Sequence, residues 1–210
     1  EAQLLFGLEG QFSFMDTLRN LRRLDQTLVD TAFPRHKSGV RVLSAPREGM
    51  DMQEVTTSEM FLLVGTLRSL FTHVVVNICG LPTVDMTELL IGNANHIIFA
   101  VDQSITSCRA GLDFQSGLKQ LGVPIADSML LVDHYLPKIS PDCKAIARSF
   151  AIERHVELPA AAELRLRAMN IGQLVFDRLV GADSSAKLSA LLDVGHRVGK
   201  HALAGSEEFG

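Results

Sequence analysis

The residues best suited to chemistry stand directly after short apolar runs of the sequence. Asn77, with Gly80 and Pro82, follows one such run, and the pair Asp133–His134 follows another. Because ligands of open parallel sheets bind at the carboxyl ends of strands, these side chains are candidate ligand contacts. A carboxylate beside an imidazole could support acid–base chemistry. No serine or cysteine nucleophile is tied to that pair by the sequence, so a polar surface loop is the favoured interpretation.

Two of the strand-end residues also have simpler explanations. A buried, hydrogen-bonded amide is the favoured interpretation of Asn77, although Gly80 and Pro82 beside it form a loop suited to a site. Asp102 ends a third apolar run and could orient a ligand. Capping of the next helix by Asp102 or Ser104 is favoured over that role.

Metal chemistry finds little support in the sequence. The cysteines Cys79, Cys108 and Cys143 are far apart and form no CxxC or Cys/His spacing, which is typical of reduced thiols in a cytosolic protein. His196 and His201 are five residues apart, so a helix would point them to different faces. We therefore predict no metal site and no catalytic residue.

Short apolar, β-branched runs between polar or turn residues predict buried strands. The predicted strands are 40–43, 73–79, 96–101 and 128–132, with a shorter fifth at 154–158 and the tail of another at 3–6. Strands that alternate with helices predict a parallel sheet covered on both faces. Several strand orders satisfy this pattern.

Helices are predicted between and after these strands. The segment 56–59, Thr-Thr-Ser-Glu, has the form of a capping box before apolar residues at helical spacing. Ser104 can cap a second helix, which stops at Gly122. Further helices over 161–171 and from Ser185 onward predict a helical C-terminal tail.

Composition is typical of one globular α/β domain. The 210 residues are 47% hydrophobic and 21% charged, which suffices for a sizeable core. A formal net charge of −4 argues against a mainly electrostatic nucleic-acid partner. No apolar run approaches the roughly 20 residues that span a bilayer, so no transmembrane segment is expected. We predict a three-layer, doubly wound, mostly parallel domain over 1–204 and a disordered tail at 205–210.

Several segments, taken in order, resemble the CpaE/TadZ family, the atypical MinD/ParA-like proteins of Flp (Tad) pilus assembly. The segment 5–7 resembles the end of the family's DLDLQFG segment, and 23–25 resembles its RLD element. The later matches are 39–46 with the GLxVLAAP strand, 73–82 with the YVVVDLP strand, and 158–172 with the LPxDxxxxxxAxxxG stretch. The order and spacing agree over nearly the whole chain.

This resemblance implies a P-loop ATPase fold in which the nucleotide-binding groups are altered. The family's phosphate-binding loop would precede Glu1, and the chain begins in mid-pattern, as an N-terminally truncated protein would. Gln3 falls where the family has a second acidic residue, and Asn77 replaces the carboxylate that helps to hold hydrated Mg²⁺. The pair Asp133–His134 replaces an Asn-Arg pair that faces the adenine. The resulting candidates for a degenerate nucleotide edge are Gln3, Asn77, Gly80, Pro82, Asp133, His134 and Pro159.

By resemblance, we expect an interaction protein that helps to assemble or localise a type IV (Flp/Tad) pilus secretion system. Its expected partners are a second copy of the chain, pilus or secretion proteins, or both, with no nucleic acid. We expect no bound cofactor, because ATP and Mg²⁺ would bind only if the missing loop were supplied. The expected location is the cytoplasm, with recruitment to the inner membrane or a cell pole through partners.

Two alternatives stay open at this point. The chain could be a fragment of an active MinD/ParA-type ATPase whose phosphate-binding loop lies upstream of Glu1. A glycine loop with a lysine there would favour this reading, and Asn77 argues against it. The chain could instead be an unrelated α/β domain that binds a small anionic ligand at Gly80 or Ser104.

Overall fold

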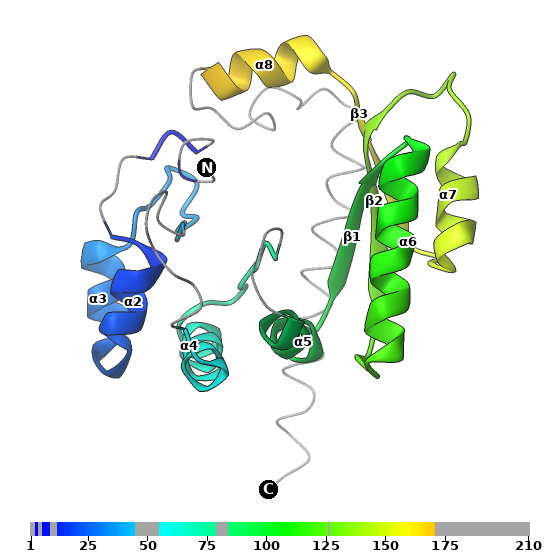
Figure 1. Cartoon of the computed structure of the whole chain (residues 1–210). Coiled ribbons are helices and arrows are strands. Elements are labelled where there is room, and N and C mark those ends of the chain that lie inside the picture. The colour runs from blue at the N-terminus through cyan, green and yellow to red at the C-terminus, as the bar shows by residue number, and fades with distance from the viewer. Residues whose placement is uncertain are drawn as a thin grey trace, which may run out of the picture. The chain divides into compact units, whose positions relative to one another are not determined.

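The computed structural model of the chain describes residues 3, 6–8, 12–44, 55–78, 84–125 and 127–170 (Figure 1). These residues belong to two compact units. The first contains the described residues up to Thr87 together with 163–170, and the second contains Glu88–Ala162. The single domain over 1–204 stays a prediction, and the expected tail at 205–210 and the helix from Ser185 lie outside the described residues.

Three parallel strands form the sheet of the second unit, in the order β1–β2–β3. β1 (Ile97–Asp102) pairs with β2 (Ser128–Tyr135), and β2 pairs with β3 (His155–Pro159). The strands predicted at 96–101, 128–132 and 154–158 are therefore confirmed. β2 extends three residues beyond its predicted end, so Asp133 and His134 lie inside the strand and not after it. The chain thus has the predicted α/β class, with a parallel sheet and helices.

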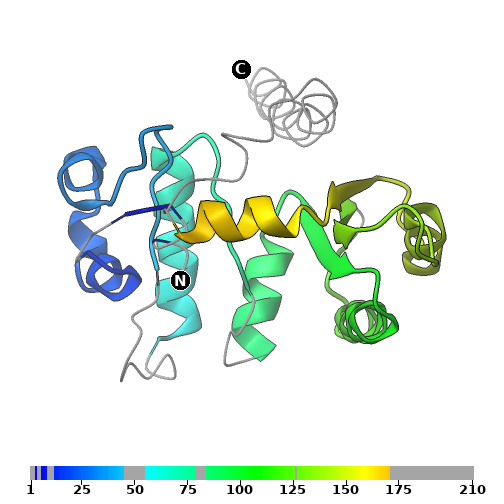
Figure 2. The ribbon, with the colours of Figure 1, turned by 90° about the horizontal axis from the view of Figure 1, so that it is seen from above.

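Two helices connect these strands and lie on one side of the sheet. α6 (Ile105–Gln120) contacts β1, α7 (Cys143–Phe150) contacts β2 and β3, and the two helices contact each other (Figures 1 and 2). Right-handed crossovers between strands that follow one another in chain order place their helices on the same face. The strand order, which the sequence pattern left open, therefore explains the position of both helices.

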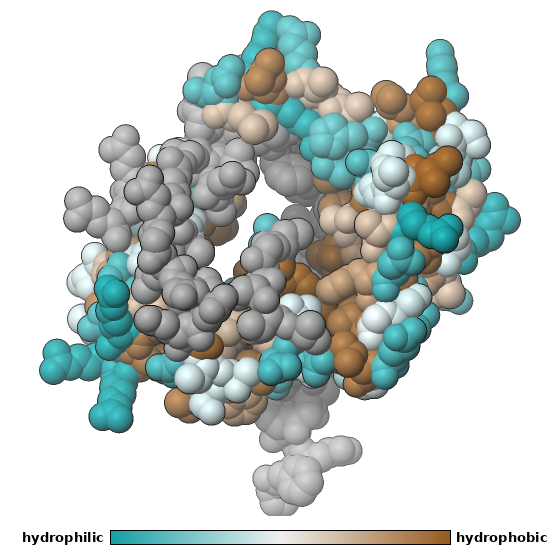
Figure 3. All heavy atoms as spheres, in the orientation of Figure 1, coloured by the Kyte–Doolittle hydropathy of each residue, from teal (hydrophilic) through white to brown (hydrophobic). Residues whose placement is uncertain are grey.

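The core of the second unit lies between this sheet face and the two helices. Leu130 and Val132 are fully buried, and the rings of Phe99 and Phe150 lie 6.4 Å apart. Gly111 of α6 permits this close packing, because an added Cβ would lie 2.9 Å from Cζ of Phe150. Other apolar side chains, brown in Figure 3, remain at the surface of this unit among polar ones.

Local signals set the ends of α6 as the sequence predicts. The hydroxyl of Ser104 accepts a hydrogen bond of 3.2 Å from the backbone N–H of Ser107 and caps the first turn. Gly122 follows the last turn with φ +73, a left-handed conformation that glycine adopts at little cost. The helix therefore begins and ends where its capping residues stand.

The first unit is mainly helical in its described residues. Its elements are α2 (Phe14–Arg19), the 3₁₀ helix η1 (Leu21–Arg23), α3 (Gln26–Ala32), α4 (Thr57–Leu70), the start of α5 (Val84–Gly92) and most of α8 (Ala162–Asn170). The predicted capping box opens α4: Thr56 and Glu59 bond each other's backbone N–H groups, at 3.0 and 3.2 Å. The helix predicted over 161–171 is present as α8.

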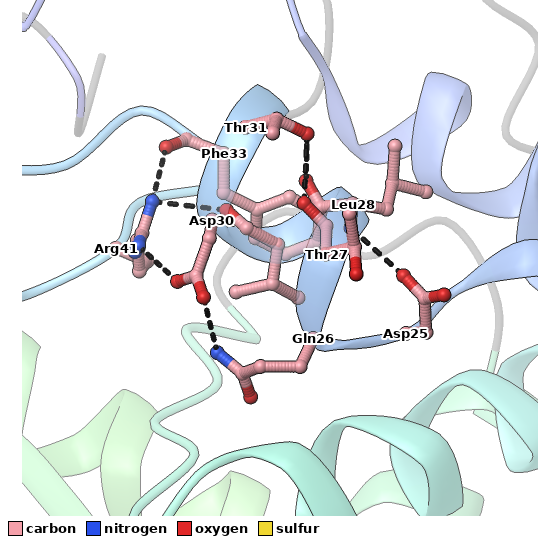
Figure 4. A network of polar contacts seen from close by, with 9 residues as sticks. Asp25, Gln26, Thr27, Leu28, Asp30, Thr31, Phe33 and Arg41 are labelled. Carbon is pink, nitrogen blue, oxygen red and sulfur yellow. Dashed lines mark hydrogen bonds and ion pairs between the residues drawn. The ribbon is translucent and has the colours of Figure 1, made fainter.

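The end of α3 is held by an arginine from the segment that follows it (Figure 4). The guanidinium of Arg41 donates to the carbonyl oxygens of Val29 and Phe33, at 2.9 and 3.0 Å, and to Asp30 Oδ1 at 2.7 Å. Carbonyl groups in the last turn of a helix have no partner within the helix, so a side-chain donor stabilises them. Arg41 therefore ties the segment after residue 39 to α3.

Three predicted strands differ from the structure. Arg41, within the predicted strand 40–43, forms a single antiparallel bridge with Arg35, and the described part of 73–79 contains no strand. Gln3 is helical and not extended. A strand requires a neighbouring backbone that completes its hydrogen bonds, and an apolar run by itself does not supply one.

Within the described part of the chain, no helix is both long and apolar enough to cross a membrane.

Candidate functional site

The carboxyl edge of the β1–β2–β3 sheet gathers several of the predicted site residues. Asp102 at the end of β1 is the register partner of Asp133 in β2, and Tyr135 of β2 is the partner of Pro159 in β3. Parallel strands present their carboxyl ends at one edge, which is where open α/β sheets bind ligands. Asp133, His134 and Pro159 are thus brought together with Asp102.

A local irregularity of β2 displays His134. Val132 pairs with Glu157 and Tyr135 pairs with Pro159, so β2 has one more residue than β3 across this interval. His134 has φ +52, a left-handed conformation that is uncommon outside glycine and that marks strained, often functional, positions. Such bulges change the direction of a side chain and are frequent beside sites.

Asp133 orients the exposed imidazole of His134. Its Oδ2 lies 3.2 Å from His134 Nδ1, and its Oδ1 accepts the backbone N–H of His134 at 2.9 Å. The His134 side chain is 57% exposed and can reach a ligand, whereas Asp133 is 31% exposed. A carboxylate that holds an imidazole in place leaves the second ring nitrogen available to donate or to accept.

Asp102 is an ionised carboxylate that also fixes the start of α6. Its Oδ1 accepts the backbone N–H of Ser104 at 2.7 Å. The hydrogen bonds from Ser104 lower the pKa of Asp102 below its ordinary value, and nearby His134 lowers it further, while Asp133 opposes the shift. The helix cap itself is Ser104. The helix-capping interpretation of this pair is therefore confirmed.

Cys108 next to Asp102 is a poor nucleophile. Its thiol donates to the carbonyl oxygen of Asp102 at 3.3 Å. Burial raises the pKa of the Cys108 thiol, and the charge of Asp102 raises it further. Because the thiolate is the reactive form, this cysteine stays protonated and contributes to packing and hydrogen bonding.

Gln103 is a structural residue of this edge whose role the sequence does not reveal. Its Nε2 donates to the carbonyl oxygens of Ile139 and Pro141, both at 3.0 Å, and of Leu136 at 3.4 Å. Its Oε1 accepts the backbone N–H of Leu136 at 2.7 Å. The sequence shows that Gln103 stands between a strand end and a helix cap. The loop that it bonds lies more than 30 residues further along the chain, so no local pattern indicates these hydrogen bonds.

The other predicted site residues lie in the first unit or outside the described residues. Gln3 donates from Nε2 to the carbonyl oxygen of Val42 at 3.2 Å, so its amide holds the segment after Arg41. Asn77 is exposed in the described run 73–78, so its interpretation as a buried amide is wrong. Gly80 and Pro82 lie outside the described residues. Their roles at a nucleotide edge stay predictions.

Metal ligation receives no support from the described ranges. Within them, no three His, Cys, Asp or Glu side chains lie close enough together to hold a metal ion. The chemistry available at the carboxyl edge is therefore that of two carboxylates and one oriented imidazole, which suits hydrogen bonding to a polar group.

Comparisons with known proteins identify the fold. No family model matches the sequence, and neither does any curated protein. The structure is similar to that of a ParA family ATPase from Chlorobium tepidum, with a TM-score of 0.72 and 14% sequence identity over 89% of this chain and 78% of that one. It is also similar to the MinD cell division protein of Aquifex aeolicus, with a TM-score of 0.68 and 13% identity over 93% and 78%.

A third similar structure is the MinC:MinD cell division protein complex of Aquifex aeolicus. Its TM-score is 0.67, and the 14% identity extends over 92% of this chain and 78% of that chain. At such low identity, these likenesses show the fold alone: this chain has a MinD/ParA-type α/β fold.

Proposed function

We propose that this protein is a MinD/ParA-like interaction protein that assembles or localises a type IV (Flp/Tad) pilus secretion system without an ATP-driven switch. The proposal is carried by the MinD/ParA-type fold. It is supported by Asn77, which by resemblance to the CpaE/TadZ family stands where that family has its Mg²⁺-associated carboxylate. A neutral amide supplies none of the negative charge that a hydrated metal site requires.

The carboxyl edge of the second unit supports the same proposal. The family's Asn-Arg pair would offer an amide and a guanidinium to the adenine, whereas Asp133 and His134 offer a carboxylate and an imidazole bound to each other. Asp102 adds a second carboxylate at that edge. Two carboxylates disfavour the approach of an anionic nucleotide by simple Coulomb repulsion.

The partners follow from the resemblance to the CpaE/TadZ family. A second copy of this chain, or proteins of the pilus and secretion machinery, would bind constitutive surfaces of the fold. The chain would act in the cytoplasm and reach the inner membrane or the cell pole through those partners. That one structural neighbour is a MinC:MinD complex supports the idea that this fold serves protein association.

Equilibrium titration with a fluorescent ATP analogue and Mg²⁺ tests the absence of a nucleotide switch. A ParA-family ATPase measured in parallel is the positive control. We expect no saturable binding up to about 1 mM, which corresponds to a binding free energy weaker than about −4 kcal/mol. Micromolar, Mg²⁺-dependent binding would overturn the proposal and favour an active ATPase.

Light scattering and a cellular assay test the interaction role. We expect the molar mass of the purified chain, alone or with a partner, to be the same with and without ATP and Mg²⁺. Removal of the protein from its native cell should abolish surface Flp pili, and the Asn77→Ala variant should restore them. Pili that persist without the protein would reject the assignment to pilus assembly.

A further inference from the structure

β1 forms one border of the sheet and has a free edge. It pairs with β2 along its whole length, from Ile97 to Asp102, and no strand of the described residues pairs with its other side (Figure 1). The backbone N–H of Ile97 donates toward β2, to the carbonyl oxygen of Asp127 at 3.1 Å. Because successive residues of a strand direct their backbone groups to opposite edges, Ile98 and Ala100 direct theirs away from β2.

The end of this free edge is closed by groups of α6. Asp102 donates its backbone N–H to Ser107 Oγ at 3.1 Å, and its carbonyl oxygen accepts the Cys108 thiol at 3.3 Å. Within the described residues, the backbone groups of Ile98 and Ala100 have no such partner. Both residues are exposed, Ile98 to 48%. Each of them therefore offers one N–H and one C=O group to a further strand.

The two borders of the sheet differ in their protection against further pairing. β3, at the other border, contains Glu157 and ends at Pro159. Charged side chains and proline are means by which edge strands avoid pairing with other chains. β1 carries no charge and no proline between Ile97 and Val101, and its register with β2 is unbroken. A regular, apolar and exposed edge of this kind is a template for another strand.

The free edge of β1 is complementary to itself. When two copies meet with β1 antiparallel about a two-fold axis at Phe99, Ile98 lies opposite Ala100 of the second copy, and the reverse pair forms as well. Directly opposite residues of this kind exchange both of their N–H···O bonds. The same symmetry puts His96 opposite Asp102 of the second copy, so that an imidazole faces a carboxylate. A second copy thus provides a partner for every open backbone group of this edge.

We propose that two copies of this chain associate by antiparallel pairing of their β1 edges, which joins two three-stranded sheets into one continuous sheet. A contact of this symmetry closes as a dimer and does not extend into a filament. Six residues of β1 are far fewer than the roughly 20–30 residues a side of a standard interface, so we expect a reversible, micromolar or weaker dimer. The proposal rests on the proposed function only in naming a second copy as a partner.

Sedimentation velocity of the full chain from about 1 to about 300 µM measures this association. We expect the wild type to shift from monomer toward dimer over that range. Ala100→Pro removes an N–H group of the free edge and keeps the hydrogen bonds to β2, so it should weaken dimerisation by about tenfold or more. A wild type that stays monomeric, or an Ala100→Pro variant that dimerises as the wild type does, would overturn the proposal.

Ile98→Lys tests the same edge with the backbone unchanged. A lysine on an edge strand disfavours pairing, so this variant should also lose the dimer. Leu121→Lys is the matched control, because Leu121 is 53% exposed at the end of α6 and should leave dimerisation unchanged. Circular dichroism confirms that each variant is folded. Equal losses in the two lysine variants would assign the association to apolar surface in general and reject the β1 edge.

Disulfide formation tests the register of the two strands. Chains with Ile98→Cys are mixed with chains with Ala100→Cys and oxidised, and mass spectrometry of the peptides identifies the joined positions. In the antiparallel register the Cα atoms of these two positions lie about 5.5 Å apart, which a disulfide can span. We expect more of the 98–100 link than of 98–98 or 100–100 links. Absence of the 98–100 link would reject this mode of association.

ATP and Mg²⁺ separate the outcomes for this proposal from those for the proposed function. A dimer that forms equally with and without them, and that Ala100→Pro abolishes, supports both. A dimer that requires them and that Ala100→Pro abolishes would retain the β1 contact and reject the absence of an ATP switch. A monomer under both conditions would reject the β1 dimer and leave the proposed function to other partner proteins.

Discussion

Two apolar segments of similar composition, 73–78 and β1, have different surroundings. The segment 73–78 begins with His73 and β1 directly follows His96, and both contain β-branched residues. In β1, Phe99 and Val101 are 6% exposed, β2 lies alongside, and α6 contacts the strand. In 73–78, Val75 is 91% exposed and Val76 is 46% exposed. The described residues of that segment form no strand.

The difference teaches that a strand depends on what lies next to it. The tendency of valine and isoleucine to form strands reflects packing on neighbours and paired backbone groups, and both are context-dependent. β1 has a parallel partner on one side and a helix above it. The consequence is that equal changes in the two segments should have unequal effects on stability.

A valine-to-alanine substitution in each segment, which removes two methyl groups, should give the largest difference in stability between them. Val101→Ala should lower the free energy of unfolding by about 2 to 3 kcal/mol, because it leaves a cavity beside buried side chains. Val75→Ala removes exposed atoms and should change it by less than about 0.5 kcal/mol. Urea denaturation of the two variants measures both values. Equal losses would mean that Val75 is buried in solution.

Glycine-to-alanine substitutions extend the comparison of packed and exposed positions to two helices. An added Cβ on Gly111 of α6 would meet Phe150 Cζ at 2.9 Å and Val101 Cγ1 at 3.0 Å, so Gly111→Ala should destabilise by at least about 1 kcal/mol. Gly65 of α4 has no atom within 4 Å of such a Cβ, so Gly65→Ala should stabilise by about 0.5 to 1 kcal/mol. The same denaturation assay measures both. A neutral Gly111→Ala would show that α6 packs less closely on Phe150.

Acid titration of Asp102 is expected to give the smallest effect. Its pKa is lowered in the fold, mainly by hydrogen bonds from Ser104, so its contribution to stability is present above its ordinary pKa of about 3.8. That contribution is lost as the pH falls through the lowered value. Ser104→Ala should move the pKa of Asp102 upward, toward 3.8, as NMR of the carboxyl carbon would show. An unchanged pKa would assign the shift to the backbone N–H of residue 104, which the substitution keeps, with His134 as the smaller contribution.

The sequence predicts the features of this molecule that depend on neighbours in the chain. Thr56 with Glu59 and Ser104 mark helix starts, and the runs that became β1, β2 and β3 carry their own apolar pattern. The strand predictions for 40–43 and for the described part of 73–79 are wrong, because strand pairing depends on distant backbone that local composition does not reveal.

In the candidate site too, features set by neighbouring residues are predictable from the sequence, whereas features set by distant residues are not. Asp133 and His134 could be placed at a strand end from their position, but the bulge that displays His134 depends on the register with β3. Gln103 stands visibly between Asp102 and Ser104. Its acceptors, however, lie 33 to 38 residues further along the chain, and no local pattern indicates them.

Gln103 also has a consequence for cleavage by proteases. Lys138 is exposed in the loop between β2 and α7, at a position that trypsin would recognise. A protease requires several residues of its substrate to open and extend into its cleft. The carbonyl oxygens of Leu136, Ile139 and Pro141 are held by one amide, so the peptide bond after Lys138 is protected while that amide stays in place. A residue that lies outside the loop therefore protects the peptide bond after Lys138 from trypsin.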